Sequence, residues 1–183
     1  MTVQTIRGVG LCARMTERGD WAFDYALDLA TAHDVRLDIF FFPTPPSQAH
    51  PSRGRSGENA ELSDQQKIDM EREVRLYYDG MLGDAMNVGF RLCEGDEEPE
   101  LRRCLLIRKE YDVLVVPYEG YGSRFGERTI ETFVESMPCP AILVGPDSPR
   151  QFFINSAARL WVSSLALEGQ SWKCVADAVQ PTS

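Results

Sequence analysis

The chain has 183 residues, of which 43% are hydrophobic and 26% charged, proportions typical of one soluble globular domain with an appendage. Its net charge of −9 and pI near 4.8 argue against nucleic acid or an anionic membrane as partner, because both attract clustered positive charge. No apolar run is long enough to span a bilayer and no secretory signal is recognised, so we expect a cytoplasmic protein.

Cysteines and histidines give no sign of a metal site or of disulfides. The sequence lacks a CxxC pair, and neither histidine has a second ligand at metal-binding spacing. No serine or cysteine stands in the context of an activated nucleophile. We therefore expect reduced thiols, no metal and no catalytic residues, so the protein is not expected to be an enzyme, although slow ATP hydrolysis is left open. The residues concerned are Cys12, Cys93, Cys104, Cys139, Cys174, His33 and His50.

The first third of the chain alternates strand patterns with helical ones. A strand is predicted over 3–12, followed by a helix over 21–32 with Asp20 as its N-cap, and then a strand over 35–42. Residues 43–60 are rich in Pro, Ser and Gly and have no apolar period. They predict an exposed, flexible loop.

The middle of the chain continues the alternation. A long amphipathic helix is predicted over 64–86, because its apolar residues recur on one side and charges fill the other. A short strand over 88–93 and a helix over 100–110 follow.

The stretch from Tyr111 to Gly145 has the strongest signal. It opens with a continuous β-branched run, typical of a strand buried on both faces of a parallel sheet. A glycine-bearing loop over 118–126 and a helix with one apolar face come next. A second buried strand, Ala141–Val144, ends the stretch. The helix is indicated by Ile130, Phe133, Val134 and Met137.

This order predicts an α/β fold: a doubly wound, five-stranded parallel sheet with helices on both faces. Residues 1–146 would form the domain. Residues 147–183 have helical spacing and predict a helical C-terminal extension, which packs either on its own domain or on a partner chain. The loop over 118–126 follows the carboxyl end of a strand, where open α/β sheets bind ligands.

Three segments carry a resemblance to a known family. They read AFDYALDLA in the first helix, CEGDEEPELRRCLL before and within the third, and PCPAILVG at the last strand. With the element order, they resemble the universal stress protein family over about residues 3–145. The resemblance implies a stress-response regulatory or interaction protein with an unknown protein partner. It also implies a homodimer formed through Ala141–Val144.

The resemblance also implies where nucleotide-binding members would hold phosphate, and this sequence departs from that pattern. Leu11-Cys12-Ala13-Arg14 stands where an Asp is expected after the first strand. Pro117 replaces the first glycine of the loop and Gly120 matches the second. The closing Gly-Ser aligns with Glu127-Arg128, or with Gly126-Glu127 if the helix start shifts. A carboxylate at Glu127 would compete with phosphate at the helix start. The favoured prediction is therefore a member without an ATP motif or cofactor.

An alternative stays open, in which a remodelled loop binds ATP or AMP with magnesium. Amide groups of a glycine-rich loop can still hold an anion, and nearby hydroxyl and guanidinium groups can assist. The other interpretation is that the glycines only shape a strand-to-helix turn. The candidate residues are Gly120, Gly122, Ser123, Arg124, Gly126 and Arg128.

Overall fold

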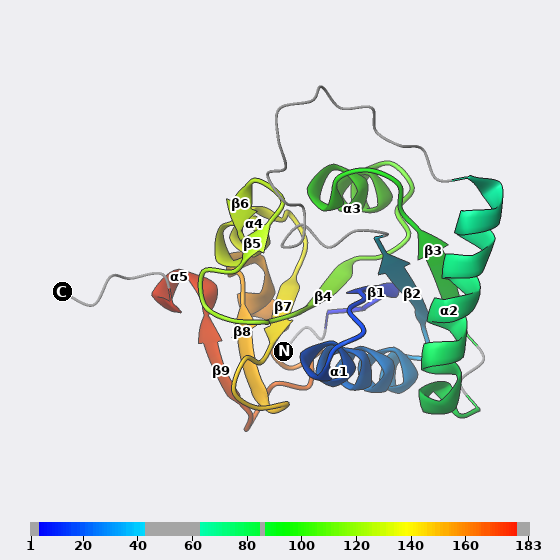
Figure 1. Ribbon diagram of the computed structural model, residues 1–183. Helices are drawn as coiled ribbons and strands as arrows, with labels where there is room; N and C mark the ends of the chain where they lie inside the picture. The colour runs from blue at the N-terminus through cyan, green and yellow to red at the C-terminus, as the bar shows by residue number, and fades with distance from the viewer. Residues whose placement is uncertain (1–3, 43–62, 85–86, 179–183) are drawn as a thin grey trace.

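The protein is described by a computed structural model that covers residues 4–42, 63–84 and 87–178 (Figure 1). The predicted loop at 43–60 lies outside these residues. In chain order the elements are β1 (Gly8–Cys12), α1 (Glu17–His33), β2 (Arg36–Phe41), α2 (Asp64–Leu82), β3 (Val88–Leu92), α3 (Glu97–Leu106), β4 (Val113–Pro117), β5 (Arg124–Phe125), β6 (Arg128–Thr129), α4 (Ile130–Ser136), β7 (Ala141–Val144), β8 (Gln151–Ile154), the 3-10 helix η2 (Ser156–Trp161), β9 (Ser171–Cys174) and α5 (Val175–Ala178).

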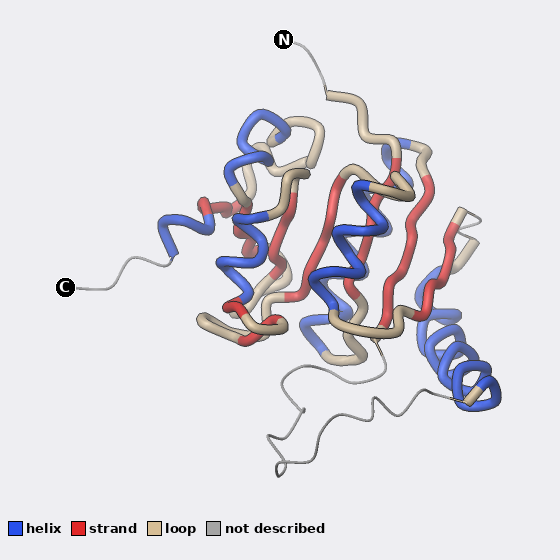
Figure 2. The backbone as a smooth tube through the Cα atoms, turned by 90° about the horizontal axis from the view of Figure 1, so that it is seen from above, coloured by secondary structure: helices blue, strands red, loops and turns tan. Residues whose placement is uncertain are grey.

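The central sheet has the strand order β3-β2-β1-β4-β7-β8-β9. The first five strands of this order are parallel, as the sequence predicts. Figure 2 shows the strands side by side in one row. Strands β2 and β3 extend the sheet on one side of β1, and the chain then crosses from β3 to β4 on the other side. The strand order therefore reverses between β1 and β4, and the carboxyl ends of these two strands form the switch point of the fold.

Two hydrophobic cores lie on opposite faces of the sheet, because successive side chains of a strand point to opposite sides. On one face Phe23 of α1 and Tyr78 of α2 stack with their ring centres 4.7 Å apart. On the other face Leu101 of α3 and Phe133 of α4 are fully buried. Figure 1 shows α3 and α4 above the sheet and α1 below it.

Helix α1 begins earlier than predicted. The hydroxyl of Thr16 accepts a hydrogen bond from the amide of Gly19 at 3.0 Å and caps the helix. Asp20, the predicted N-cap, lies in the first turn, where its negative charge interacts favourably with the helix dipole.

The sheet has seven strands instead of five, and the C-terminal segment is not helical as predicted. Strand β8 pairs antiparallel with β7, and β9 pairs parallel with β8. In the described part of this segment, the predicted helix is represented only by the short 3-10 helix η2 and the short helix α5. The apolar run Phe152, Phe153 and Ile154 forms an inner strand because its side chains are buried within both cores.

Both edges of β7 are therefore hydrogen-bonded within one chain. Val144 lies opposite Pro117 of β4 on one side and opposite Phe152 of β8 on the other. The predicted homodimer contact through Ala141–Val144 has to be corrected, because β8 already occupies the edge that a second copy would use.

Asn155 fixes this arrangement at the end of β8. Its side chain is completely buried, and its amide nitrogen lies 2.9–3.3 Å from the carbonyl oxygens of Val134, Met137 and Cys139. Its amide oxygen accepts hydrogen bonds from the backbone of Ala141 and Ala158. One side chain thus joins α4, the start of β7 and η2.

The segment after η2 packs on its own domain, which is one of the two arrangements that the sequence left open. The hydroxyl of Tyr25 donates to the carbonyl of Leu165 at 2.8 Å, and Nε2 of His33 lies 2.6 Å from the carbonyl oxygen of Ser164. The hydroxyl of Ser164 donates to the carbonyl of Gln4. The segment closes the core beside α1, with Leu165 and Leu167 fully buried.

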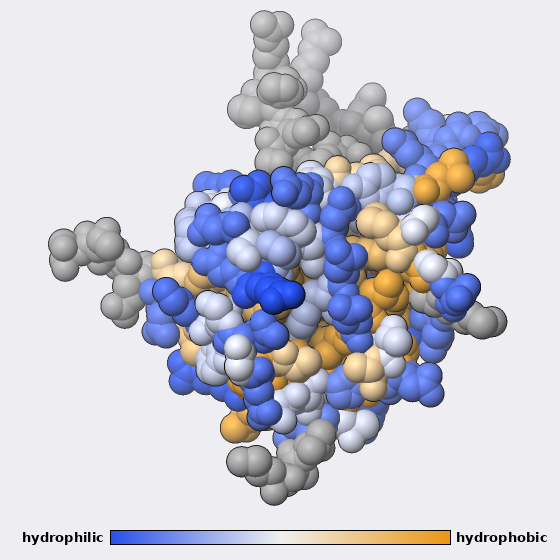
Figure 3. Space-filling model, turned by 90° about the horizontal axis from the view of Figure 1, so that it is seen from below, coloured by the Kyte–Doolittle hydropathy of each residue, from blue (hydrophilic) through white to orange (hydrophobic). Residues whose placement is uncertain are grey.

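Helix α2 covers its end of the sheet incompletely. Only Val74 and Tyr78 are buried, while Ile68 and Leu76 are exposed. Figure 3 shows a mostly hydrophilic surface with hydrophobic residues in its right half, the half in which α2 lies. Among the described residues, none of the helices has the length and apolar character needed to cross a membrane.

We predict that Asn155→Ala lowers the free energy of unfolding by about 2–4 kcal/mol, because buried backbone groups of three elements lose their partners. Urea denaturation measures the change. Asn87→Ala is the matched control: Asn87 is exposed, and among the described residues only its backbone carbonyl is hydrogen-bonded, so its substitution should cost about 0.5 kcal/mol or less. Equal effects of the two substitutions would contradict the role given to Asn155.

Candidate functional site

A cavity of about 460 Å³ opens at the switch point of the sheet. Arg14 follows β1, Pro117 ends β4, and Ser123 and Arg124 come from the segment after β4. The rings of Pro117 and Phe125 give it apolar surface. Its position is the one expected for a ligand site in an open α/β sheet.

A small hairpin separates β4 from α4 and shapes the cavity. Strands β5 and β6 pair antiparallel, with Phe125 opposite Arg128. The turn uses Gly126 at φ +66°, a conformation that side chains with a Cβ rarely adopt. The buried ring of Phe125 stacks on Phe133 of α4, with ring centres 4.2 Å apart. The hairpin is thereby held against the domain.

Glu131 places a carboxylate inside the glycine loop. Its Oε1 accepts hydrogen bonds from the amide of Gly122 at 2.7 Å and from the hydroxyl of Tyr118 at 2.5 Å. The side chain is nearly inaccessible, with 4% of the residue exposed. Burial raises the pKa of Tyr118, and the hydrogen bond to the Glu131 carboxylate is the next largest cause of the shift. The phenol therefore stays protonated and remains a donor. A loop amide that would serve a bound anion is thus already paired with the chain's own carboxylate.

The sequence assigned this competing carboxylate to Glu127, which is wrong. Glu127 is exposed in the hairpin turn, and among the described residues only its backbone carbonyl is hydrogen-bonded, accepting from the Arg124 side chain. Helix α4 begins at Ile130, and the first-turn residue Glu131 points back to the loop. The inserted hairpin causes the difference, because it shifts the helix start away from Gly126.

Arg14 forms a buried ion pair where the nucleotide-binding pattern would have an Asp. Its Nη2 lies 2.7 Å from Oε1 of Glu97, the first residue of α3. The other oxygen of Glu97 is buried and has no hydrogen-bond partner among the described residues. The guanidinium also lies 5.9 Å from the ring centre of Phe125. Arg14 therefore connects the end of β1 with α3 and the hairpin.

Burial raises the pKa values of two groups around Arg14. The pKa of Glu97 lies above its ordinary value because its carboxyl is buried, although the Arg14 guanidinium opposes the shift. Burial also raises the pKa of the neighbouring Cys12 thiol to about 12, so this cysteine is protonated at neutral pH and is not a reactive thiolate.

Glu119 supplies the exposed acidic side of the cavity. Its Oε1 accepts a hydrogen bond from the Thr16 hydroxyl at 2.7 Å, and its Oε2 lies 3.8 Å from Arg18. These contacts tie the loop after β4 to the start of α1. The sequence pattern did not indicate Glu97, Glu119 or Glu131, because pairing between distant segments leaves no local signal.

The structure places the six predicted site residues in one loop and hairpin, but only Ser123 and Arg124 line the cavity. The Ser123 hydroxyl donates to the carbonyl of Gly120, and the Gly122 amide donates to Glu131. Arg124 donates to the carbonyl of Glu127, and Arg128 lies 3.5 Å from Glu98 of α3. Most of their polar groups thus have partners within the chain.

Structural comparison places this fold beside that of the universal stress proteins. Universal stress protein UspA from Lactobacillus plantarum superposes with a TM-score of 0.57 at 14% identity, over 79% of this chain and all of the other. A family protein from Burkholderia pseudomallei gives 0.52 at 17% identity, over 75% and 96%. A universal stress protein solved in complex with cAMP gives 0.52 at 16% identity, over 77% and 98%.

These comparisons establish the universal stress protein fold for this chain, in agreement with the resemblance seen in the sequence. No family model matches the sequence. No curated protein matches it either. At identities of 14–17% the shared fold does not by itself carry a function.

We predict that Glu131→Ala lowers the free energy of unfolding by about 1–3 kcal/mol, because the Tyr118 hydroxyl and the Gly122 amide lose their buried acceptor. Glu127→Ala, in the same hairpin but exposed, should change it by about 0.5 kcal/mol or less. Urea denaturation compares the two. A Glu131 variant as stable as the Glu127 variant would show that the internal carboxylate does not hold the loop.

Glu97 should leave a signature in the pH dependence of stability. Its folded pKa lies above the unfolded value of 4.5, so the folded state binds more protons in that interval and the free energy of unfolding falls as pH rises through it. A tenfold difference in proton affinity between the two states corresponds to about 1.4 kcal/mol. Relative to the wild type, Glu97→Gln should therefore gain stability from pH 4.5 upward and then level off. Urea midpoints between about pH 4 and pH 8 that differ by a constant amount would contradict this assignment.

Proposed function

We propose that this chain is a regulatory or interaction protein of the universal stress protein type that does not hold a nucleoside triphosphate in its glycine loop. The observation that carries the proposal is the Glu131 carboxylate, which accepts from the Gly122 amide and the Tyr118 hydroxyl. A phosphate at this amide would meet a buried negative charge, and like charges at short distance repel strongly in a poorly solvated site.

The ion pair of Arg14 with Glu97 supports the same proposal. It places two charged side chains where the nucleotide-binding pattern would offer a single Asp. The partner in this proposal is another protein, which docks on a surface other than the β7 edge, since β8 covers that edge. We also place the protein in the cytoplasm, supported by five cysteines that are all free thiols.

A second candidate function is binding of an adenine nucleotide with few phosphates. Two observations favour it: Arg14 and Arg124 line the cavity beside the rings of Pro117 and Phe125, and one protein of the same fold was solved in complex with cAMP. In this alternative the nucleotide uses the cavity and the two arginines instead of the loop amides.

Thermal melts with about 1 mM ATP and magnesium, AMP or cAMP test the proposal. We expect no nucleotide to change the melting temperature, because none has a usable phosphate site. A ligand at about 100 times its dissociation constant adds about 2.7 kcal/mol of stability. For a chain of this size that corresponds to a shift of about 5–10 °C.

A shift of that size with ATP would overturn the proposal. A shift with AMP or cAMP alone would favour the second candidate, provided that Arg124→Gln abolishes it. Arg150→Gln is the matched control, since Arg150 is exposed and does not line the cavity.

A further inference from the structure

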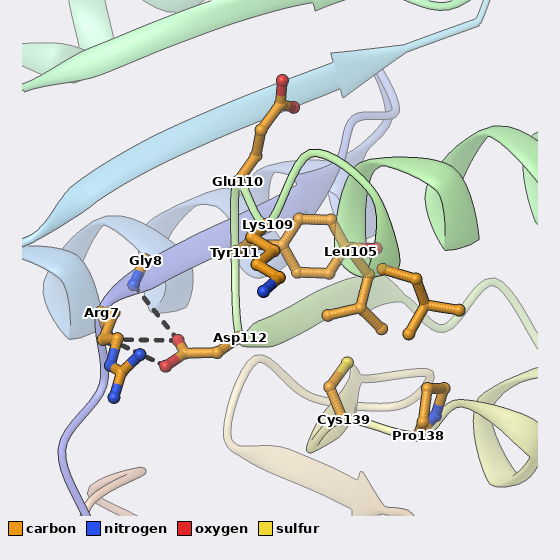
Figure 4. A pocket seen from close by; sticks show the side chains of 10 residues that line it. Arg7, Gly8, Leu105, Lys109, Glu110, Tyr111, Asp112, Pro138 and Cys139 are labelled. Atoms are coloured by element: carbon orange, nitrogen blue, oxygen red, sulfur yellow. Dashed lines mark hydrogen bonds between the residues drawn. The ribbon is translucent and has the colours of Figure 1, made fainter.

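A second cavity lies at the opposite end of the sheet, where the strands begin (Figure 4). Gly8 starts β1, Asp112 precedes β4, and Cys139 precedes β7, so three neighbouring strands of the sheet meet there. The end of α3 forms its far wall with Leu105 and Leu106. The volume is about 350 Å³, at the small end of the range for ligand sites.

The floor and walls of this cavity are apolar. The ring of Tyr111 is buried, and its hydroxyl donates to the carbonyl of Leu101 at 2.6 Å, so its polar end is already paired. Burial raises the pKa of the Cys139 thiol to about 12, which keeps the thiol neutral at physiological pH. At the rim Leu106 remains 56% exposed and Pro138 is also exposed. This surface suits a hydrocarbon group.

Both carboxylates near the cavity have partners in the protein. The oxygens of Asp112 accept from the amides of Arg7 and Gly8 at 3.0–3.2 Å. Glu110 is paired with Arg91 and lies 3.9 Å from Arg108. Figure 4 shows the Glu110 carboxylate directed away from Leu105 and Cys139. The charge of Glu110 is therefore compensated by Arg91, whereas Asp112 keeps its negative charge, because backbone amides stabilise a carboxylate without discharging it.

The cations at the cavity mouth are Arg7 and Lys109, which lie on either side of Asp112 in the view of Figure 4. Among the described residues, neither side chain makes an ion pair or a hydrogen bond. Lys109 also adopts φ +52°, a left-handed conformation that costs a residue with a Cβ about 1 kcal/mol. In a chain of net charge −9, two unpaired cations beside an apolar cavity are a distinct feature.

We propose that this cavity binds a small amphiphile with one carboxylate, such as a medium-chain fatty acid. The hydrocarbon chain packs against Leu105, Leu106 and Cys139. The carboxylate contacts the Arg7 guanidinium, which can donate two parallel hydrogen bonds, and the Lys109 ammonium at the cavity mouth, where the two cations outnumber the single carboxylate of Asp112. A single negative charge fits better than a multiply charged phosphate, because Asp112 stands between the two cations. The proposal is independent of the cavity at the other end of the sheet.

Titration of the full chain with octanoate tests the proposal by calorimetry, with amide NMR shifts to locate the site. We expect saturable binding with shifts at Tyr111 and Cys139. Octan-1-ol, which lacks the charge, and octylammonium, which reverses it, should each bind at least about 10-fold more weakly. The double variant Arg7→Gln/Lys109→Gln should weaken octanoate binding by a similar factor, which is about 1.4 kcal/mol.

The matched control is Arg150→Gln/Lys173→Gln, which removes two exposed cations elsewhere and should leave binding unchanged. For the apolar wall, Leu106→Asn should weaken binding. Leu160→Asn, at a leucine that is 83% exposed on η2, should not. Absence of saturable binding, equal binding of octylammonium, or equal effects of test and control variants would overturn the proposal.

Discussion

The strand β7 must be hydrogen-bonded on both edges, since a buried strand with unpaired backbone groups loses a large part of its stability. In this chain β4 satisfies one edge and β8 the other. The antiparallel return requires the chain to reverse after Val144, and the buried amide of Asn155 then satisfies the backbone groups around the start of β7. The segment that follows is held beside α1, so the C-terminal part of the described chain belongs to the domain.

This closure changes how the fold can meet other molecules. An open β7 edge would offer backbone donors and acceptors to a second copy. Here that edge is internal, and the outer strands of the row are β3 and β9. Among the described residues, the strands whose outer edges are not paired within the sheet are therefore β3 and β9.

Charges within the protein similarly reshape the switch point. Arg14 with Glu97, and Glu131 with Gly122 and Tyr118, satisfy groups that a ligand would otherwise contact. At the other end of the sheet Glu110 is paired with Arg91 and Asp112 accepts from backbone amides, whereas among the described residues the side chains of Arg7 and Lys109 make no ion pair. The two ends of the same strands thus differ in chemistry: at one end the cavity is bordered by an internal ion pair and a hydrogen-bonded carboxylate, and the other end presents two cations beside apolar surface.

Local periodicity was enough to predict five parallel strands and the order of strands and helices along the chain, because buried strands such as Val113–Val116 and amphipathic helices have strong, repeated patterns. It also placed the loop with Ser123 and Arg124 at the carboxyl end of a strand, and the structure shows that this strand, β4, borders the switch point. The folded structure was needed to show that Phe152–Ile154 forms a strand against β7 and that Glu131, not Glu127, enters the loop. Both depend on contacts between segments, and a short apolar run or a single carboxylate has no local pattern that reveals its partner.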